Sequence, residues 1–310
     1  MAAHQSILYY FAAGEGHSDG IHRAVAQARA TGASLTILRV VVPAAGMLSR
    51  LRGANLDASG ADWDQAEAEL AALRESLADA GVPLRTLVRQ GRPGEVILRQ
   101  VEAGTYTLVM KRAAGDDGRL LGSTARLLMR QCPTTVWVVK PGERPQHVVA
   151  AVDPEGEPAL QRRIVLRARD LARQTGSYLT LVSAWDLPAA SLYQTRLHPD
   201  DVEPLLVEAE RDARRRLDDL LADTPGALPV EERVHLRGPH GPALLTFLSQ
   251  RSPDALVLGS RSRGSVARRL LGHTAERVLT DVDCSVVVLR PQQTTATQPT
   301  RAHQDALAES

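Results

Sequence analysis

The chain has 310 residues, 37 of them basic and 36 acidic, with 44% hydrophobic and 3% aromatic residues. This length and apolar content suffice for two domains of ordinary size. The near-zero net charge argues against a general nucleic-acid or membrane-surface binder, since either would need a basic field over much of its surface. No apolar run approaches membrane-spanning length. The two cysteines, Cys132 and Cys284, share no metal-ligand spacing and are predicted to be buried thiols in a reducing cytoplasm.

The first half of the chain alternates apolar runs, typical of strands, with segments of helical periodicity. The first apolar run is preceded by no Lys or Arg, so it is interpreted as a strand and not as a signal peptide. We expect strands at Ile7–Phe11, Ser34–Val42, Leu84–Arg89, Leu108–Lys111 and Val136–Val139. We expect helices at Ile21–Thr31 and about Trp63–Ala80, with further helices on either side of the fourth strand.

The second half shows the same alternation, and its last two apolar runs contain no polar residue. We expect strands at Val148–Val152, Tyr178–Ala184, Val230–Leu236, Ala255–Leu258 and Val286–Leu289. Helices are predicted at Leu160–Thr175, at Pro204–Ala222 and, from apolar residues at helical spacing, between Val266 and Leu279. Gly32 and Gly176 stand where C-cap glycines of the first helices belong.

An internal repeat relates the two halves. TGASLTIL at Thr31–Leu38 returns as TGSYLTLV at Thr175–Val182, and VWVVKP at Val136–Pro141 returns as VVVLRP at Val286–Pro291. The repeat predicts domains at 1–141 and 146–291, followed by a polar, disordered tail at 292–310. Because strands alternate with helices, the fold class is α/β, with two doubly wound, Rossmann-like domains that each contain a five-stranded parallel sheet.

The loop after the strand at Ala255–Leu258 is rich in Gly, Ser and Arg. A loop that joins a parallel strand to a helix lies at the carboxyl edge of the sheet, where open α/β folds bind ligands. Small residues such as Gly259, Ser260 and Ser262 let backbone amides approach an anion, and Arg261 adds positive charge. This composition is typical of a phosphate-binding loop.

The same stretch resembles the ATP-binding signature of universal stress proteins, G-x-x-G-(nine residues)-G-[Ser/Thr]. Gly259 and Gly272 match its first and third glycines, while Ser262 stands at the second glycine and His273 at the hydroxyl position, one residue before Thr274. The resemblance covers nearly the whole chain twice. It implies a tandem two-domain member of the family: a cytoplasmic stress-response protein, regulatory or protective and not catalytic, that binds ATP in its second domain.

The resemblance also assigns roles to residues of the second copy. Asp153, followed by Pro154, would accept hydrogen bonds from the adenine or ribose. The residues that would hold or neutralise the phosphates are Ser260, Arg261, Ser262, His273 and Thr274, between Gly259 and Gly272. The plainer interpretation of Asp153-Pro154 is a turn. In the first copy, Ala12 stands in the place of Asp153 and Lys111 in the place of the first glycine, which predicts a degenerate site there.

Two alternatives differ in class from a regulatory ATP-binding protein. One is an interaction scaffold, or a carrier of another small molecule, in which neither domain binds nucleotide. The other is a weak ATP hydrolase, although the loop contains no base or metal-binding carboxylate positioned beside the phosphates. No metal-ligand cluster or catalytic histidine grouping occurs in the sequence, and a need for Mg²⁺ stays open.

The two domains are expected to pair within one chain as the subunits of a family dimer do. The predicted contact joins the apolar edge strands Val136–Val139 and Val286–Leu289, because an exposed apolar edge of a parallel sheet invites pairing. This arrangement is an intramolecular pseudo-dimer, and it is compatible with a further homodimer.

Overall fold

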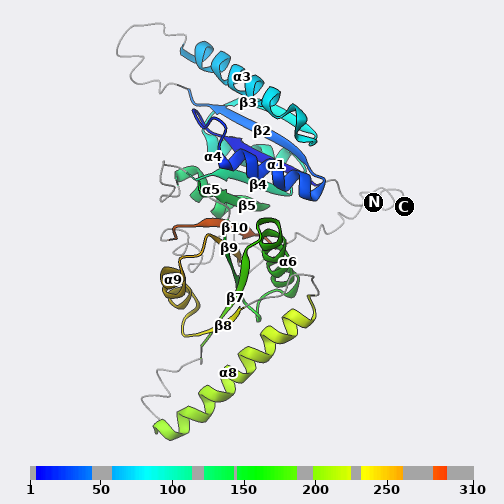
Figure 1. Cartoon of the computed structure of the whole chain (residues 1–310). Coiled ribbons are helices and arrows are strands. Elements are labelled where there is room, and N and C mark those ends of the chain that lie inside the picture. Colours follow the sequence, from blue (N-terminus) through cyan, green and yellow to red (C-terminus); the bar gives the residue numbers. More distant parts are fainter. Residues whose placement is uncertain are drawn as a thin grey trace, which may run out of the picture.

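The computed structural model describes residues 5–43, 58–113, 122–142, 145–186, 198–224, 232–260 and 282–291. In these ranges ten strands form one continuous sheet, in the order β3-β2-β1-β4-β5-β10-β9-β6-β7-β8 (Figure 1). The first five strands are β1 Ser6–Phe11, β2 Ser34–Val41, β3 Leu84–Gln90, β4 Leu108–Arg112 and β5 Thr135–Val139. The other five are β6 His147–Val152, β7 Tyr178–Trp185, β8 Glu232–Arg237, β9 Ala255–Gly259 and β10 Ser285–Leu289.

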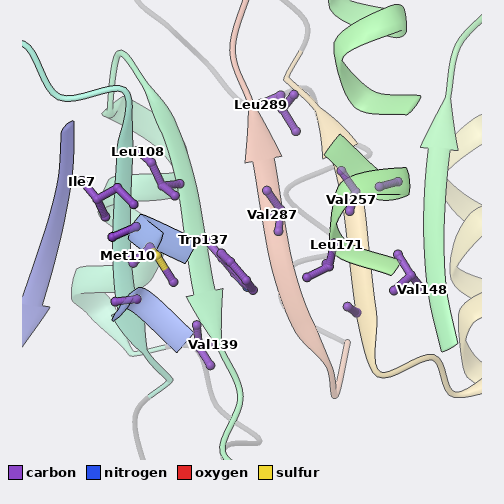
Figure 2. Close-up of a cluster of buried hydrophobic side chains, with 14 of the residues drawn as sticks. Ile7, Leu108, Met110, Trp137, Val139, Val148, Leu171, Val257, Val287 and Leu289 are labelled. Carbon is purple, nitrogen blue, oxygen red and sulfur yellow. The ribbon is translucent and has the colours of Figure 1, made fainter. Parts of the chain in front are cut away.

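Each half of this sheet is parallel, which confirms the predicted α/β class with two doubly wound, five-stranded halves. The halves meet where β5 and β10 pair antiparallel, with Val287 opposite Trp137 at the centre of the ladder. Every residue of β10 is buried, as are four of the five in β5. Figure 2 shows side chains from both halves, including Trp137 and Val287, around this junction. The predicted pairing of the two apolar edge strands is therefore confirmed.

Helices cover both faces of the sheet, so the strands between them can be apolar on both sides. One face carries α1 Asp19–Thr31, α3 Ala58–Ser76, α6 Pro158–Thr175 and α8 Pro199–Ala222. The other face carries α4 Pro93–Ala103, α5 Ser123–Gln131 and α9 His240–Arg251, and a short 3₁₀ turn, η1, spans Ala78–Ala80. The predicted C-cap glycines are confirmed, since Gly32 and Gly176 have φ angles of 62° and 73°.

Helix α8 begins at Pro199, so the predicted start at Pro204 is wrong. Pro204 lies inside the helix, where its missing N–H removes a single bond near the N-terminus, while Pro199 occupies the first turn, where proline is well tolerated. This helix carries surface ion pairs at a spacing of four residues, Glu210–Arg214 and Asp212–Arg216. The predicted helix between Val266 and Leu279 and the tail at 292–310 lie outside the described residues.

The strand ladders align the two copies residue by residue. In the second copy, Gly259 pairs with Leu289 on β10. In the first copy, Arg112 pairs with Val139 on β5, which is the residue equivalent to Leu289. The next residues agree, because Ala113 and Ser260 each donate a backbone hydrogen bond to those partners, with N···O distances of 2.7 and 2.9 Å. Arg112 therefore occupies the place of Gly259, and the prediction that Lys111 does so is wrong by one residue.

Each copy has a glycine where a helix crosses the end of its fourth strand. In the second copy this glycine is on the strand, and in the first copy it is on the helix. A Cβ on Gly259 would lie 2.9 Å from Cδ1 of Ile164 on α6. In the first copy, the strand residue is Arg112, and the glycine is Gly20 on α1, whose Cβ would lie 3.1 Å from Cβ of Arg112. Gly20 and Ile164 are equivalent, since each lies twelve residues before its C-cap glycine. The close approach thus explains Gly259 by packing alone.

Cutting the chain before Pro145 tests the β5–β10 junction. We expect the two fragments to stay together, because the ladder and the buried apolar side chains around it do not depend on the linker. Size-exclusion chromatography with light scattering measures the mass. The matched control is the same cut in a Val287→Asp protein, where a buried charge should separate the fragments. Well-behaved, non-associating fragments without that substitution would contradict the prediction.

Gly259→Ala tests the helix–strand contact. The added Cβ should destabilise the protein by about 1–3 kcal/mol through overpacking, measured from urea denaturation. Combining it with Ile164→Val, which lacks Cδ1, should cost less than the sum of the two single changes. Gly60→Ala is the control, since its Cβ would meet nothing within 4 Å. If Gly259→Ala were as stable as Gly60→Ala, this packing role would be wrong.

Candidate functional site

The strand order identifies one crevice in each half of the sheet. From β6 the chain runs outward to β7 and β8, and then returns to form β9 on the other side of β6. Such a reversal is a topological switch point, and open α/β sheets bind ligands outside the carboxyl ends of the two strands that flank it. The crevice of the second copy is therefore at β6 and β9, and that of the first copy at β1 and β4.

The β6/β9 crevice brings together four residues predicted to bind ligand. Asp153 and Pro154 directly follow β6, while Gly259 ends β9 and Ser260 follows it. Because Ala151 pairs with Leu258, the two strands end in register, about 4.8 Å apart as neighbouring strands are. The remaining predicted site residues, Arg261, Ser262, Gly272, His273 and Thr274, lie outside the described residues.

Asp153 forms a tight turn after β6. Its Oδ1 accepts a hydrogen bond from the Glu155 amide at 3.2 Å, and its carbonyl accepts one from the Gly156 amide at 2.7 Å. The Asp153 amide donates to Oε1 of Gln161 on α6 at 2.8 Å. The turn expected as the plainer interpretation is thus present. A carboxylate has about four acceptor positions, so the turn is compatible with a ligand contact as well.

Ser260 is committed to the sheet through its backbone. Its amide donates to the Leu289 carbonyl at 2.9 Å, and the residue is only 3% exposed. The prediction that this amide holds a phosphate is therefore wrong, since the β-sheet ladder already uses its single proton.

In the β1/β4 crevice of the first copy a side chain of the protein itself takes the central place. Glu15 accepts hydrogen bonds from the Tyr9 hydroxyl, from Ser18 Oγ at 2.5 Å and from the Ala12 amide at 2.9 Å. Ala12 is equivalent to Asp153, and its amide is satisfied here by a carboxylate, as the Asp153 amide is by Gln161. Sequence reasoning missed Glu15, although the flanking Gly14 and Gly16, at φ 65° and 59°, mark a loop that can fold back.

Cations complete this first-copy cluster. Lys111 is 5% exposed, and its ammonium donates to the Arg112 carbonyl. Burial lowers the pKa of Lys111 to about 8, partly opposed by the charge of Glu15, while Arg112 lowers it further. Burial also raises the pKa of Tyr9, and the Glu15 carboxylate adds to that shift. The β1/β4 edge is thus a self-contained network of acceptor, donors and charges.

Two of the histidines near the second-copy edge, His235 and His240, lie in the described residues, while His273 does not. His235 Nδ1 lies 3.2 Å from Ser183 Oγ, and burial lowers the pKa of the imidazole. His240 begins α9. The part of the chain that is described contains no group of three or more side chains that could hold a metal ion. Among the described helices, none combines the length and apolar content needed to cross a bilayer. Cys132 and Cys284 are both buried, as predicted.

Comparison with known proteins agrees with the repeat. The family model described as the universal stress protein family matches residues 6–140 and again 145–290. Universal stress protein E of Salmonella typhi is 28% identical over 234 residues, which cover 69% of this chain and 71% of the relative. A Mycolicibacterium smegmatis universal stress protein is 26% identical over 223 residues, covering 68% and 70%.

Solved structures show the same fold over nearly the whole chain. A universal stress protein structure from Pseudomonas aeruginosa UCBPP-PA14 superposes with a TM-score of 0.66 at 21% identity, covering 93% of this chain and 94% of its own. A functionally unknown protein from Pseudomonas aeruginosa PAO1 superposes with a TM-score of 0.68, also at 21% identity, and covers 93% of both chains. With two consecutive family matches spanning almost all of its residues, this chain belongs to the universal stress protein family.

Proposed function

We propose that this protein is a cytoplasmic, regulatory or protective binding protein whose second domain, at 146–291, takes an adenine nucleotide in the β6/β9 crevice. The observation that supports the proposal is that Asp153 follows β6 where the neighbouring strand β9 ends at Gly259, at the topological switch point. A carboxylate there can accept hydrogen bonds from an exocyclic amine or from ribose hydroxyls, which is what recognition of an adenine nucleoside requires.

The phosphates would lie over the start of the following loop. The Ser260 hydroxyl, the hydroxyls of Ser262 and Thr274, the ring of His273 and the charge of Arg261 are the groups proposed to contact them. Anion binding by such a loop uses hydrogen-bond donors and positive charge together. With ATP as the ligand, Mg²⁺ would accompany the phosphates if it is needed. Chemistry at the phosphates is no part of the proposal.

The first domain, at 1–141, is proposed to bind no nucleotide. Ala12 offers no carboxylate at the position of Asp153, and Glu15 already occupies the acceptor position of that crevice. A triphosphate brought close to Glu15 would meet a like charge in a partly buried setting, where repulsion is weakly screened. The two domains therefore differ in function although they share one fold.

A second candidate is an interaction scaffold, or a carrier of another small molecule, without nucleotide binding. Two hydrogen bonds at the carboxyl edge of the second copy favour this second candidate, because the Asp153 side chain and the Ser260 amide both have structural roles. The two candidates differ in whether the β6/β9 crevice has measurable affinity for ATP. A weak hydrolase would additionally release phosphate from that same site.

Restoring the family signature tests the proposal. If the loop needs left-handed backbone at position 262, a residue other than glycine would adopt it at a cost of about 1–2 kcal/mol. That cost corresponds to roughly a five- to thirty-fold loss of affinity. Ser262→Gly should therefore tighten ATP binding by about that factor, and His273→Ser by less. Isothermal titration calorimetry of the full chain, with and without Mg²⁺, gives the dissociation constants.

Asp153 provides the control. Asp153→Asn retains an oxygen that can accept from the Glu155 amide, so the turn should survive, while its charge and one acceptor oxygen are lost. This variant should weaken ATP binding in both the parent and the Ser262→Gly background. If neither the parent nor Ser262→Gly binds ATP, the nucleotide proposal is wrong and the scaffold becomes the better description.

A further inference from the structure

A second concave site lies at the junction of the two domains. This junction cleft has a volume of about 650 Å³ and is lined by residues of both domains, among them Gln27 of α1, Thr107, Thr135 of β5, Arg163 and Arg167 of α6 and Arg290. It is reached from the amino ends of β1, β4 and β5, and neither Asp153 nor Ser260 lines it. The junction cleft is therefore distinct from the β6/β9 crevice. Its volume falls in the range of about 300–1,000 Å³ that small-molecule sites occupy.

The lining of the junction cleft carries excess positive charge. Three arginines face one carboxylate, Asp170, and that carboxylate is already paired with Arg173 at 3.0 Å. Two of the arginines also make hydrogen bonds to backbone carbonyls, and one of these bonds crosses the junction. Arg163 donates to the Arg290 carbonyl at 2.7 Å, and Arg290 donates to the Met129 carbonyl at the end of α5. Arg163 is thus held within its own domain, and Arg290 is held by a contact that crosses the junction.

Arg167 is the residue whose surroundings are incomplete. Its guanidinium lies over the ring of Trp137, 5.1 Å from the centroid. Its Nη2 atom is buried without a hydrogen-bond partner in the described structure. Burial lowers the pKa of Arg167 to about 10, partly opposed by Asp170, so the group still carries its charge at neutral pH. A partly buried cation with one nitrogen that lacks a hydrogen bond is costly unless a counter-charge reaches it.

Gln27 shows the same deficit from the other domain. It is 2% exposed, and its Oε1 atom is buried without a partner in the described structure. Gln27 and Arg167 both line the junction cleft, on helices α1 and α6, which face each other across the β5–β10 pair (Figure 1). Two residues from different domains, each with one buried unsatisfied atom, therefore line one cavity. A ligand with an anionic group and a hydroxyl would satisfy both.

We propose that the junction cleft binds a small organic anion, a carboxylate or phosphate ester, with the Arg167 guanidinium as its main partner and Gln27 as acceptor for a ligand hydroxyl. A guanidinium matches both anions through two parallel hydrogen bonds, and its face remains stacked on Trp137. Because the site takes residues from both domains, its ligand also stabilises their pairing. The binding is independent of the proposed nucleotide site.

Ligand-induced stabilisation of the full chain tests this inference. The probes are glucose 6-phosphate for a phosphate ester, glycerate for a hydroxy-carboxylate, and inorganic phosphate, each at constant ionic strength against chloride. We expect at least one organic probe to raise Tm in a saturable manner, since a ligand of the folded state stabilises it by mass action. A saturable effect of glucose 6-phosphate alone assigns a phosphate ester, and one of glycerate alone assigns a carboxylate.

Variants on α6 and α1 locate the effect. Arg167→Gln should weaken binding of the active probe at least tenfold by calorimetry, and Gln27→Leu should weaken it less. Arg162→Gln is the matched control, because Arg162 is a partly exposed arginine of α6 that does not line the cleft and pairs with Asp223 instead. If no organic probe gives a saturable shift, or if the Arg167 and Arg162 variants respond alike, the proposal is overturned. Buried water would then be the partner of Arg167 and Gln27.

Discussion

The antiparallel pairing of β5 with β10 is the contact on which the rest of the molecule depends. It joins two parallel half-sheets into one sheet of ten strands, with Trp137 opposite Val287 at the centre. Because the halves are each parallel but run in opposite directions, the carboxyl ends of their strands lie at opposite edges of the sheet. The two crevices are therefore far from each other, and each domain can keep or lose its site without affecting the other. The same pairing brings α1 and α6 to face each other and so creates the junction cleft.

The two copies share one architecture but have different residues at the carboxyl ends of their strands. The first copy fills its switch point with Glu15, held by Tyr9, Ser18 and the Ala12 amide, and tolerates a buried Lys111 close by. The second copy has Asp153 in a turn and buries Leu258 at the position equivalent to Lys111. A glycine stands at the helix–strand contact in both copies, on the strand as Gly259 in one and on the helix as Gly20 in the other.

Much of the fold could be predicted from the sequence because its determinants are local. Apolar runs mark strands covered on both faces, Gly32 and Gly176 mark helix ends, and the repeat extends each inference to the other half. The start of α8 could not, because Pro204 looks like a helix start and is instead accommodated inside a longer helix. The equivalence of Arg112 with Gly259 was missed for a different reason. Ten residues separate Arg112 from Gly122, and thirteen separate Gly259 from Gly272. Spacing alone does not show where in the loop the three missing residues belong.

The candidate sites could be predicted only in part, because they depend on residues far apart in the chain. Asp153 and Gly259 were predicted from strand ends and a family signature, and the pairing of Ala151 with Leu258 shows that their two strands end side by side. Glu15 required a loop with two left-handed glycines to fold back on Tyr9, which no periodicity reveals. Arg167 looks like one of several arginines on a helix until Trp137 and Gln27 of the other domain are placed beside it.

The central claim is that the two domains share one fold but differ in the ligand site at the carboxyl edge of the sheet. Hydrogen–deuterium exchange of the full chain, with and without saturating ATP, tests it most directly because peptides from each loop are measured separately. We expect ATP to slow exchange across residues 259–273 and to leave residues 111–122 unchanged, since Glu15 occupies the first crevice. Equal protection of both loops, or protection of residues 111–122 alone, would contradict the claim.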